Sequence, residues 1–209
     1  MLVALLVIAA VSGGVLGLVY GMTKDAIAEV DQKKNEAAIK AVLPLENVTY
    51  KADTLKYNYE GVNLTFPCNL AFDANGNFQG AAVKTSEGGF GGKIDMMVGF
   101  LADGTIKGTS VLSHTETPGL GANMTGKFKD QFVDKNPASY KLTVTKDGGD
   151  VDAITAATIT SRAFSKAVDK AYQAFEANKA QFMNNAPVEE IVIETEETIE
   201  ITEGGTENE

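Results

Sequence analysis

The chain has 209 residues, of which 44% are hydrophobic and 22% are charged, and its formal net charge is −10. This length accommodates one ordinary domain with a small appendage. The negative charge argues against nucleic acid as a partner, because binding to phosphates needs a basic face. A single cysteine and a single histidine exclude an internal disulfide, a thiolate cage for zinc or iron–sulfur, and a haem held by two histidines. Any redox chemistry therefore needs an organic cofactor, and we expect no metal site.

The first part of the chain is apolar, and residues 2–20 contain no charged side chain. At ~1.5 Å per helical residue this run reaches roughly 28 Å, close to the thickness of the hydrocarbon core of a bilayer. A cleaved signal peptide is the alternative, but no basic region precedes the run, which exceeds the usual ~7–15 residues. The run is also apolar on every face, unlike a helix of a soluble core. We therefore predict a transmembrane helix over residues 1–22.

A helical linker is predicted for residues 23–44, because hydrophobic residues recur near one face and Pro44 ends the pattern. Short runs typical of strands follow at 68–72, 78–85, 93–101, 105–115 and 140–146. Turn residues at 73–77 and 102–104 favour antiparallel hairpins.

Two helices are predicted after these runs, a short one over 123–132 and a long amphipathic one over 161–182. Strands grouped before a long helix indicate an α+β domain, which we place at residues 45–184. The remaining segment, 185–209, contains nine glutamates and no lysine or arginine. We expect it to be a disordered acidic tail, and the alternative is a strand bound to a partner.

Residues 152–161, directly before the long helix, are rich in hydroxyl groups: Thr155, Thr158, Thr160 and Ser161. Backbone N–H groups at a helix N-terminus lack internal partners and, with the helix dipole, favour an anion such as a phosphate. The alternative is a plain N-cap, for which one or two hydroxyl groups are enough.

Two glycine-containing loops also stand out. Residues 114–121 read HTETPGLG, in which Pro118-Gly119 suits a tight turn and Gly121 adds freedom for a positive φ. Its backbone N–H groups and the Glu116 carboxylate are suited to a flavin ring edge or ribityl hydroxyls, although a plain loop would have the same composition. Residues 88–92, GGFGG, lack the GxxxxGK[ST] pattern of a phosphate loop and favour a hairpin connection or close backbone packing.

The order of three motifs resembles the FMN-binding domain of the RnfG and NqrC subunits: GGFGGKIDMMVGF at 88–100, HTETPGLG at 114–121 and DAITAATITS at 152–161. These subunits belong to the Rnf complex and to the sodium-pumping NADH:quinone reductase. The resemblance extends from the N-terminal apolar run to about residue 182.

In that family a flavin transferase recognises a D-x-x-[ST]-G-A-T pattern and joins FMN to its last threonine through a phosphoester bond. The resemblance thus implies covalent FMN on Thr158 and transferase recognition of Asp152. Ala156 stands where glycine is usual, and we expect the added methyl group to be tolerated. Further cofactor contacts are implied for two threonines near the phosphate and for five residues of the second motif: Thr155, Thr160, Glu116, Thr117, Gly119, Leu120 and Gly121.

The resemblance implies an electron-transfer subunit, anchored in the inner membrane, of an Rnf-type complex that couples ferredoxin:NAD+ oxidoreduction to Na+ or H+ translocation. Its partners would be the other subunits of that complex, and it would have no independent active site beyond the flavin. The family places the flavin domain on the periplasmic or extracellular side, whereas the lysines after the apolar run alone would place it in the cytoplasm. No NAD-binding fingerprint is present.

Three alternatives stay open at this stage. The first is an NqrC-type subunit. The second is a stand-alone, membrane-tethered FMN carrier that serves an extracellular reductase. The third is a non-redox surface module whose threonine run is only a helix cap.

Overall fold

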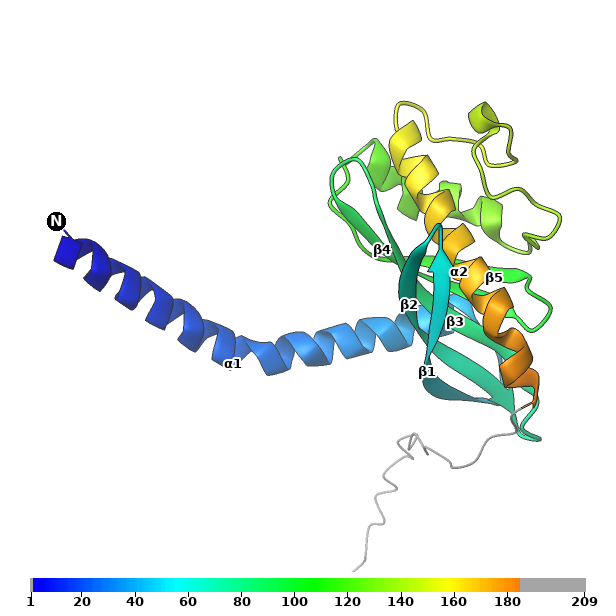
Figure 1. Ribbon diagram of the computed structural model, residues 1–209, viewed down its shortest axis with the longest axis horizontal. Coiled ribbons are helices and arrows are strands. Elements are labelled where there is room, and N and C mark those ends of the chain that lie inside the picture. Colours follow the sequence, from blue (N-terminus) through cyan, green and yellow to red (C-terminus); the bar gives the residue numbers. More distant parts are fainter. Residues whose placement is uncertain (1, 185–209) are drawn as a thin grey trace, which may run out of the picture.

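The computed structural model describes residues 2–184 and consists of a long N-terminal helix attached to an α+β domain (Figure 1). The acidic segment 185–209, for which a disordered tail or a partner-bound strand was predicted, lies outside the described residues. The main elements are α1 (Leu2–Val42), β1 (Val48–Tyr59), β2 (Val62–Asp73), β3 (Phe78–Gly88), β4 (Lys93–Leu101), β5 (Ile106–Ser113) and α2 (Thr158–Asn184).

The five strands form one antiparallel sheet in the order β1-β2-β3-β4-β5. Both predicted hairpin turns are confirmed, at 73–77 between β2 and β3 and at 102–104 between β4 and β5. In the first turn the Asp73 carboxylate accepts the backbone N–H groups of Asn75 and Asn77 at 2.9 and 2.8 Å. The Asp73 side chain thus accepts backbone N–H groups of the turn, where the hydrogen bonds between β2 and β3 end.

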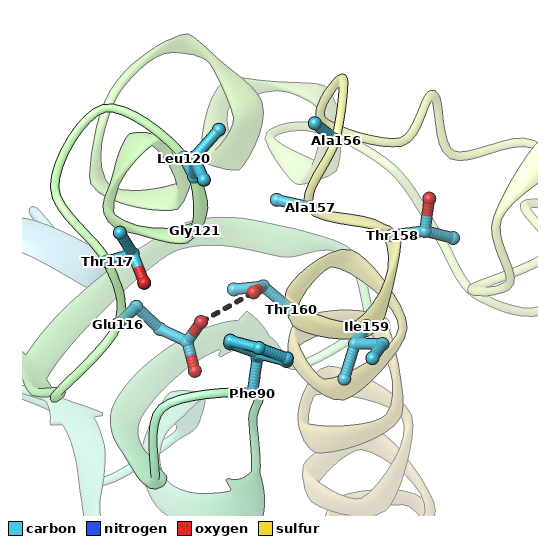
Figure 2. A pocket seen from close by; sticks show the side chains of 10 residues that line it. All are labelled: Phe90, Glu116, Thr117, Leu120, Gly121, Ala156, Ala157, Thr158, Ile159 and Thr160. Atoms are coloured by element: carbon cyan, nitrogen blue, oxygen red, sulfur yellow. Dashed lines mark hydrogen bonds between the residues drawn. The ribbon is translucent and has the colours of Figure 1, made fainter.

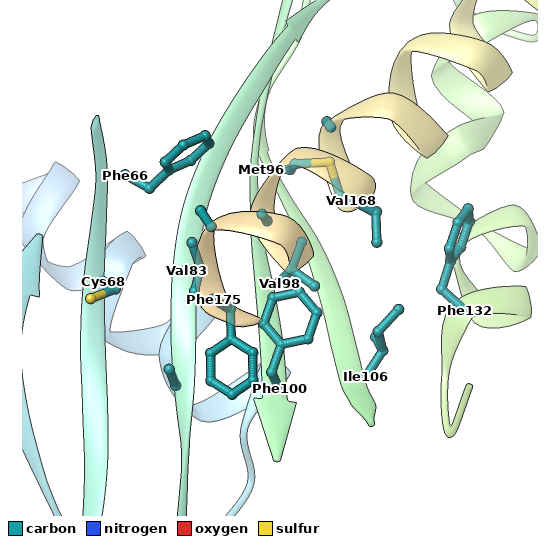
Figure 3. Packing of buried hydrophobic residues seen from close by; sticks show 14 of the residues in the cluster. Phe66, Cys68, Val83, Met96, Val98, Phe100, Ile106, Phe132, Val168 and Phe175 are labelled. Atoms are coloured by element: carbon teal, nitrogen blue, oxygen red, sulfur yellow. The ribbon is translucent and has the colours of Figure 1, made fainter. Parts of the chain in front are cut away.

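Helix α2 covers one face of the sheet and forms the larger hydrophobic core with it (Figure 3). The predicted spacing is confirmed, since Phe164, Ala167, Val168 and Ala171 are all buried. Phe175 stacks on Phe100 of β4 with ring centroids 5.1 Å apart. Cys68 of β2 also lies in this core, and burial raises the pKa of its thiol to about 12.

The last turns of α1 pack on the opposite face of the sheet, so that the sheet lies between two helices. The backbone of Val42 lies directly over Gly99 and Gly108, which are paired across β4 and β5. A Cβ atom at Gly108 would lie 2.9 Å from the Val42 Cα atom, which is closer than packed carbon atoms approach. Two glycines therefore permit the close contact that fixes the end of α1 to the domain.

The structure differs from the predicted secondary structure in three places. The strand β1 and the first half of β2 were missed because β1 is a sheet edge with mostly exposed, polar residues, of which only Leu55 is fully buried. Residues 140–146 are not a strand: Leu142 and Val144 are buried, but Val144 forms only an isolated bridge with Val151. The segment 123–132 folds as two 3₁₀ helices, η1 (Gly121–Thr125) and η2 (Lys127–Phe132), instead of one α-helix.

Helix α1 runs without interruption through the predicted span and the predicted linker. Between residues 2 and 184, no helix meets the length and apolarity required to cross a membrane.

Candidate functional site

The site begins at the N-terminus of α2, whose first residue is Thr158. The first backbone hydrogen bond of this helix runs from the Ser161 N–H to the Ala157 carbonyl at 3.0 Å. In the described part of the chain, the N–H groups of Thr158, Ile159 and Thr160 donate to no partner. Three free donors and the positive end of the helix dipole are therefore available to an anion.

The loop before α2 is held in place by side chains on both sides. Ser161 Oγ accepts the N–H of Ile154 at 2.9 Å and donates to the Ala157 carbonyl at 3.0 Å. The backbone of Asp152 forms two hydrogen bonds with the Gln131 amide, one donated and one accepted, at 2.8 and 3.1 Å. The hydroxyl of Ser161 thus fixes the loop before α2 and does not cap the N–H groups of the first helical turn. The Thr158 hydroxyl forms no hydrogen bond with the residues that the structure describes.

Ala156 adopts a left-handed backbone conformation with φ +59°. It occupies the third position of a turn closed by the Ala157 N–H donating to the Ile154 carbonyl at 3.0 Å. A type II turn requires positive φ at that position, which is why glycine is preferred there. A glycine at this position would adopt the turn without steric strain, and this chain adopts it with alanine.

A buried carboxylate joins the second motif to α2. Glu116 is 5% exposed, and its Oε2 atom accepts the Thr160 hydroxyl at 2.6 Å (Figure 2). Its Oε1 atom accepts the backbone N–H of Gly91 at 2.9 Å. Its own N–H donates to His114 Nδ1 at 3.2 Å. Both oxygen atoms of Glu116 are thus satisfied by groups from two other segments.

The glycine hairpin between β3 and β4 packs closely against the 114–116 segment, as the sequence predicted for residues 88–92. The N–H of Gly89 donates to the Gly92 carbonyl at 2.7 Å and closes the hairpin. The Thr115 hydroxyl donates to the Gly91 carbonyl at 3.0 Å. A Cβ atom on Gly91 would overlap the Thr115 carbonyl, so only glycine permits this approach. The hairpin carries Phe90 at its tip, with 70% of the side chain exposed.

These segments enclose a pocket of about 360 Å³, which is within the usual size range of cofactor and ligand sites. Glu116 and Thr160 lie inside the pocket, whereas Thr158 is at its edge with its hydroxyl directed away from that pair (Figure 2). The pocket is lined by Phe90, Glu116, Thr117, Leu120, Gly121, Ala156, Ala157, Thr158, Ile159 and Thr160.

The structure brings five of the predicted site residues together as pocket lining: Glu116, Thr117, Leu120, Gly121 and Thr160, with Thr158 at the rim. Thr155, Gly119 and Asp152 are exposed nearby but do not line the pocket. The positive φ expected for Gly121 belongs to Gly119 instead, at +76°. Gly121 is required for a different reason, because a Cβ atom there would lie 2.7 Å from the Thr160 hydroxyl.

Four residues that line the pocket were not among the predicted cofactor contacts: Phe90, Ala156, Ala157 and Ile159. The signal for Phe90 was present in the sequence, because a large aromatic residue between two pairs of glycines cannot pack within its own hairpin. Ile159 lies between two threonines of the recognised motif and interrupts the hydrophobic spacing of α2, since it faces away from the core.

Comparison with known proteins assigns this fold and site to a class. The model of the FMN-binding domain matches residues 89–173, which include every residue that lines the pocket.

Relatives along almost the whole chain give a more specific assignment. The G subunit of the ion-translocating oxidoreductase complex of Aliivibrio fischeri (strain MJ11) is 35% identical over 195 residues, covering 88% of this chain and 91% of that protein. The G subunit of the Na(+)-translocating ferredoxin:NAD(+) oxidoreductase complex of Acetobacterium woodii is 34% identical over 185 residues, covering 82% and 88%. The chain belongs to this family of oxidoreductase G subunits, which confirms the resemblance seen in the motifs.

A more distant likeness is the solved structure of the C subunit of the Na(+)-translocating NADH-quinone reductase from Parabacteroides distasonis. It is 17% identical, with a TM-score of 0.48 over 75% of this chain and 96% of that chain.

Proposed function

We propose that this chain is the flavin-carrying electron-transfer subunit of an Rnf-type ion-translocating oxidoreductase, with FMN joined through its phosphate to Thr158. The family assignment supports the role in a multisubunit complex that couples ferredoxin:NAD+ oxidoreduction to Na+ or H+ translocation. The match to the FMN-binding domain supports the cofactor. The observation that carries the attachment site is the placement of Thr158 beside three free N–H donors at the edge of a pocket.

The residues of this site suit both the phosphate and the flavin ring system of FMN. The start of α2 offers the N–H groups of Thr158, Ile159 and Thr160 to the negatively charged phosphate. The pocket beside it combines apolar walls with the polar Glu116–Thr160 pair, the usual composition of a cofactor site. When bound, FMN supplies the capacity to accept and release one or two electrons, and the protein positions the flavin and tunes its surroundings.

The test is covalent flavin in the unfolded protein. The full chain, produced together with a flavin transferase, is separated by denaturing electrophoresis and viewed under ultraviolet light. We expect a fluorescent band from the native sequence and none from Thr158→Val. Thr145→Val is the matched control, because Thr145 is also an exposed threonine but lies outside the motif at 152–161. A band that survives Thr158→Val would contradict the proposed attachment.

Thr160→Val distinguishes attachment of the flavin at Thr158 from attachment at Thr160. Thr160 is 1% exposed and its hydroxyl donates to Glu116, so loss of this hydroxyl should destabilise the fold without removing the bound flavin. If the fluorescent band were instead lost with Thr160→Val and kept with Thr158→Val, the attachment would be at Thr160. A colourless native protein in cells that contain the transferase would favour the non-redox surface module.

We further propose that residues 2–20 anchor the chain in the inner membrane, with the flavin domain on the periplasmic or extracellular side. The support is the uncharged run itself and the exposure of large apolar side chains on α1, among them Leu5, Ile8, Val15, Leu16 and Leu18. A protein held by this segment should stay with the membrane fraction in alkaline carbonate. Deletion of residues 2–20 should release it, and retention of the deleted protein would contradict the proposal.

The complex and the stand-alone carrier predict different companions. Mild detergent extraction of the native chain should recover the other subunits together with it. Recovery of the flavoprotein alone under conditions that preserve membrane complexes would favour the tethered carrier.

Asp152 is exposed, so the transferase can reach its carboxylate. Asp152→Asn should therefore lower the flavin content without changing the fold.

A further inference from the structure

Exposed hydrophobic side chains are concentrated around the pocket. Between residues 43 and 184, five large hydrophobic residues are exposed, and three of them line the pocket: Phe90, Leu120 and Ile159. They come from three separate segments, the β3–β4 hairpin, the 114–121 loop and the first turn of α2. Scattered apolar residues are normal on a surface, but a cluster at the mouth of a pocket indicates that something covers it.

The hairpin that carries Phe90 is held rigidly although the side chain itself is exposed. Both backbone groups of Gly91 are bonded to the neighbouring segment, the N–H to Glu116 at 2.9 Å and the carbonyl to the Thr115 hydroxyl at 3.0 Å. Glu116 in turn accepts the hydroxyl of Thr160 on α2 at 2.6 Å. The position of Phe90 relative to the start of α2 is therefore set by a chain of hydrogen bonds before any ligand binds, which lowers the entropic cost of contact.

We infer that Phe90 covers the ring system of the bound flavin, with Ile159 and Leu120 completing an apolar enclosure. This inference rests on the proposed attachment of FMN to Thr158. Phe90 and Leu120 lie on opposite sides of the pocket, with the Glu116–Thr160 pair between them (Figure 2). A flat aromatic cofactor and a phenyl ring favour an offset stack or an edge contact, and such contact removes both surfaces from water. Phe90 is thus a positioning and shielding residue for the flavin.

The absence of tryptophan from the chain provides a direct probe of this contact. Tryptophan in contact with a flavin excited by visible light donates an electron to it and quenches its emission, whereas distant tryptophan does not. The test variant is Phe90→Trp. The matched control is Met183→Trp, because Met183 is also exposed, at 55%, but lies 25 residues along α2 from Thr158. That separation corresponds to roughly 37 Å along the helix axis.

Both variants are made as the full chain with the transferase, and flavin emission is divided by the covalent flavin content measured after unfolding. We expect native Phe90→Trp to emit several-fold less per flavin than native Met183→Trp, and the difference to disappear in denaturant. Equal native emission from the two variants would overturn the inference. Because the covalent content is measured first, a native sequence without bound flavin would reveal failure of the attachment proposal separately.

A second measurement uses loss of the ring and does not depend on introduced tryptophan. Phe90→Ala should increase the quenching of flavin emission by iodide, because the flavin becomes more accessible to solvent. Phe90→Leu should restore part of the protection by its bulk. Iodide quenching that is the same in Phe90→Ala and the native sequence would also overturn the inference.

Discussion

The left-handed turn at Ala156 gives a quantitative prediction for Ala156→Gly. An L-residue in this region has its Cβ atom too close to the following carbonyl, at a cost of roughly 1–2 kcal/mol that glycine does not incur. Glycine in turn gives the unfolded chain more freedom, which lowers stability by about 0.4–1 kcal/mol. Ala156 is exposed, so removal of its methyl group loses little packing. The expected net gain in the free energy of unfolding is about 0.5–1 kcal/mol.

The control is Ala153→Gly in the same loop, since Ala153 does not have a positive φ. Both substitutions change the unfolded chain equally, so their difference reports the native state. Ala153→Gly should lower stability by at least about 0.4–1 kcal/mol, because no backbone strain is relieved and a half-buried methyl group is lost as well. The two variants should therefore differ by roughly 1–2 kcal/mol in favour of Ala156→Gly.

Urea unfolding and thermal melting measure this difference. For a domain of this size, the gain from Ala156→Gly corresponds to an increase in Tm of roughly 1–4 °C. If the two variants were destabilised to the same extent, the backbone strain assigned to Ala156 would be refuted. Flavin content of Ala156→Gly should be no lower than that of the native sequence, because the turn that presents Thr158 is retained.

Three further predictions concern other contacts. Gly108→Ala should destabilise the domain by about 1–3 kcal/mol in urea unfolding, because its Cβ atom would overlap the end of α1, whereas an unchanged midpoint would contradict the close packing. The hydrogen bonds from Arg162 lower the pKa of Asp147, so this ion pair stabilises the fold above the ordinary aspartate pKa and its contribution is lost as pH falls through the lowered value. Asp147→Asn should therefore be less stable than the native sequence at neutral pH, and their melting temperatures should converge in acid. Glu116→Ala and Thr160→Val should show a coupling free energy of about 0.5–3 kcal/mol in a double-mutant cycle, and additivity would show that their hydrogen bond contributes nothing.

The sequence predicted the parts of the fold in which local pattern and burial agree. The long amphipathic helix was found within three residues because its apolar spacing matches a helix that covers a sheet. Strands β3 and β4 were found because they are buried on both faces and read as continuous apolar runs. The edge strand β1 was missed because its side chains are mostly exposed and its pattern is set by pairing with β2.

The sequence predicted most of the residues that form the site, but not how they contact one another in space. Nothing local to Glu116 indicates that its carboxylate accepts the Thr160 hydroxyl, because the two residues are 44 positions apart. Residues 88–92 were predicted to form a hairpin connection or to pack closely, and both are found, yet the partner of that packing depends on the register of β4 and β5. Sequence motifs therefore named most pocket residues, whereas the exposed Phe90 could be placed only with the tertiary structure.

The position of Glu116 explains how a pocket made from loops can be rigid. Loops move unless their backbone groups have partners, and here one carboxylate binds the glycine hairpin through one oxygen and α2 through the other. A carboxylate suits this role because it accepts at two oxygen atoms at once, and glutamine could accept at only one. The closest approach of the hairpin then requires glycine, and the only bulky residue that the hairpin can carry is one directed outward, as Phe90 is. The GGFGG and TETPGLG motifs thus contact each other, and both are connected to the start of α2 through Glu116. A substitution in either motif should therefore alter the position of the first turn of α2.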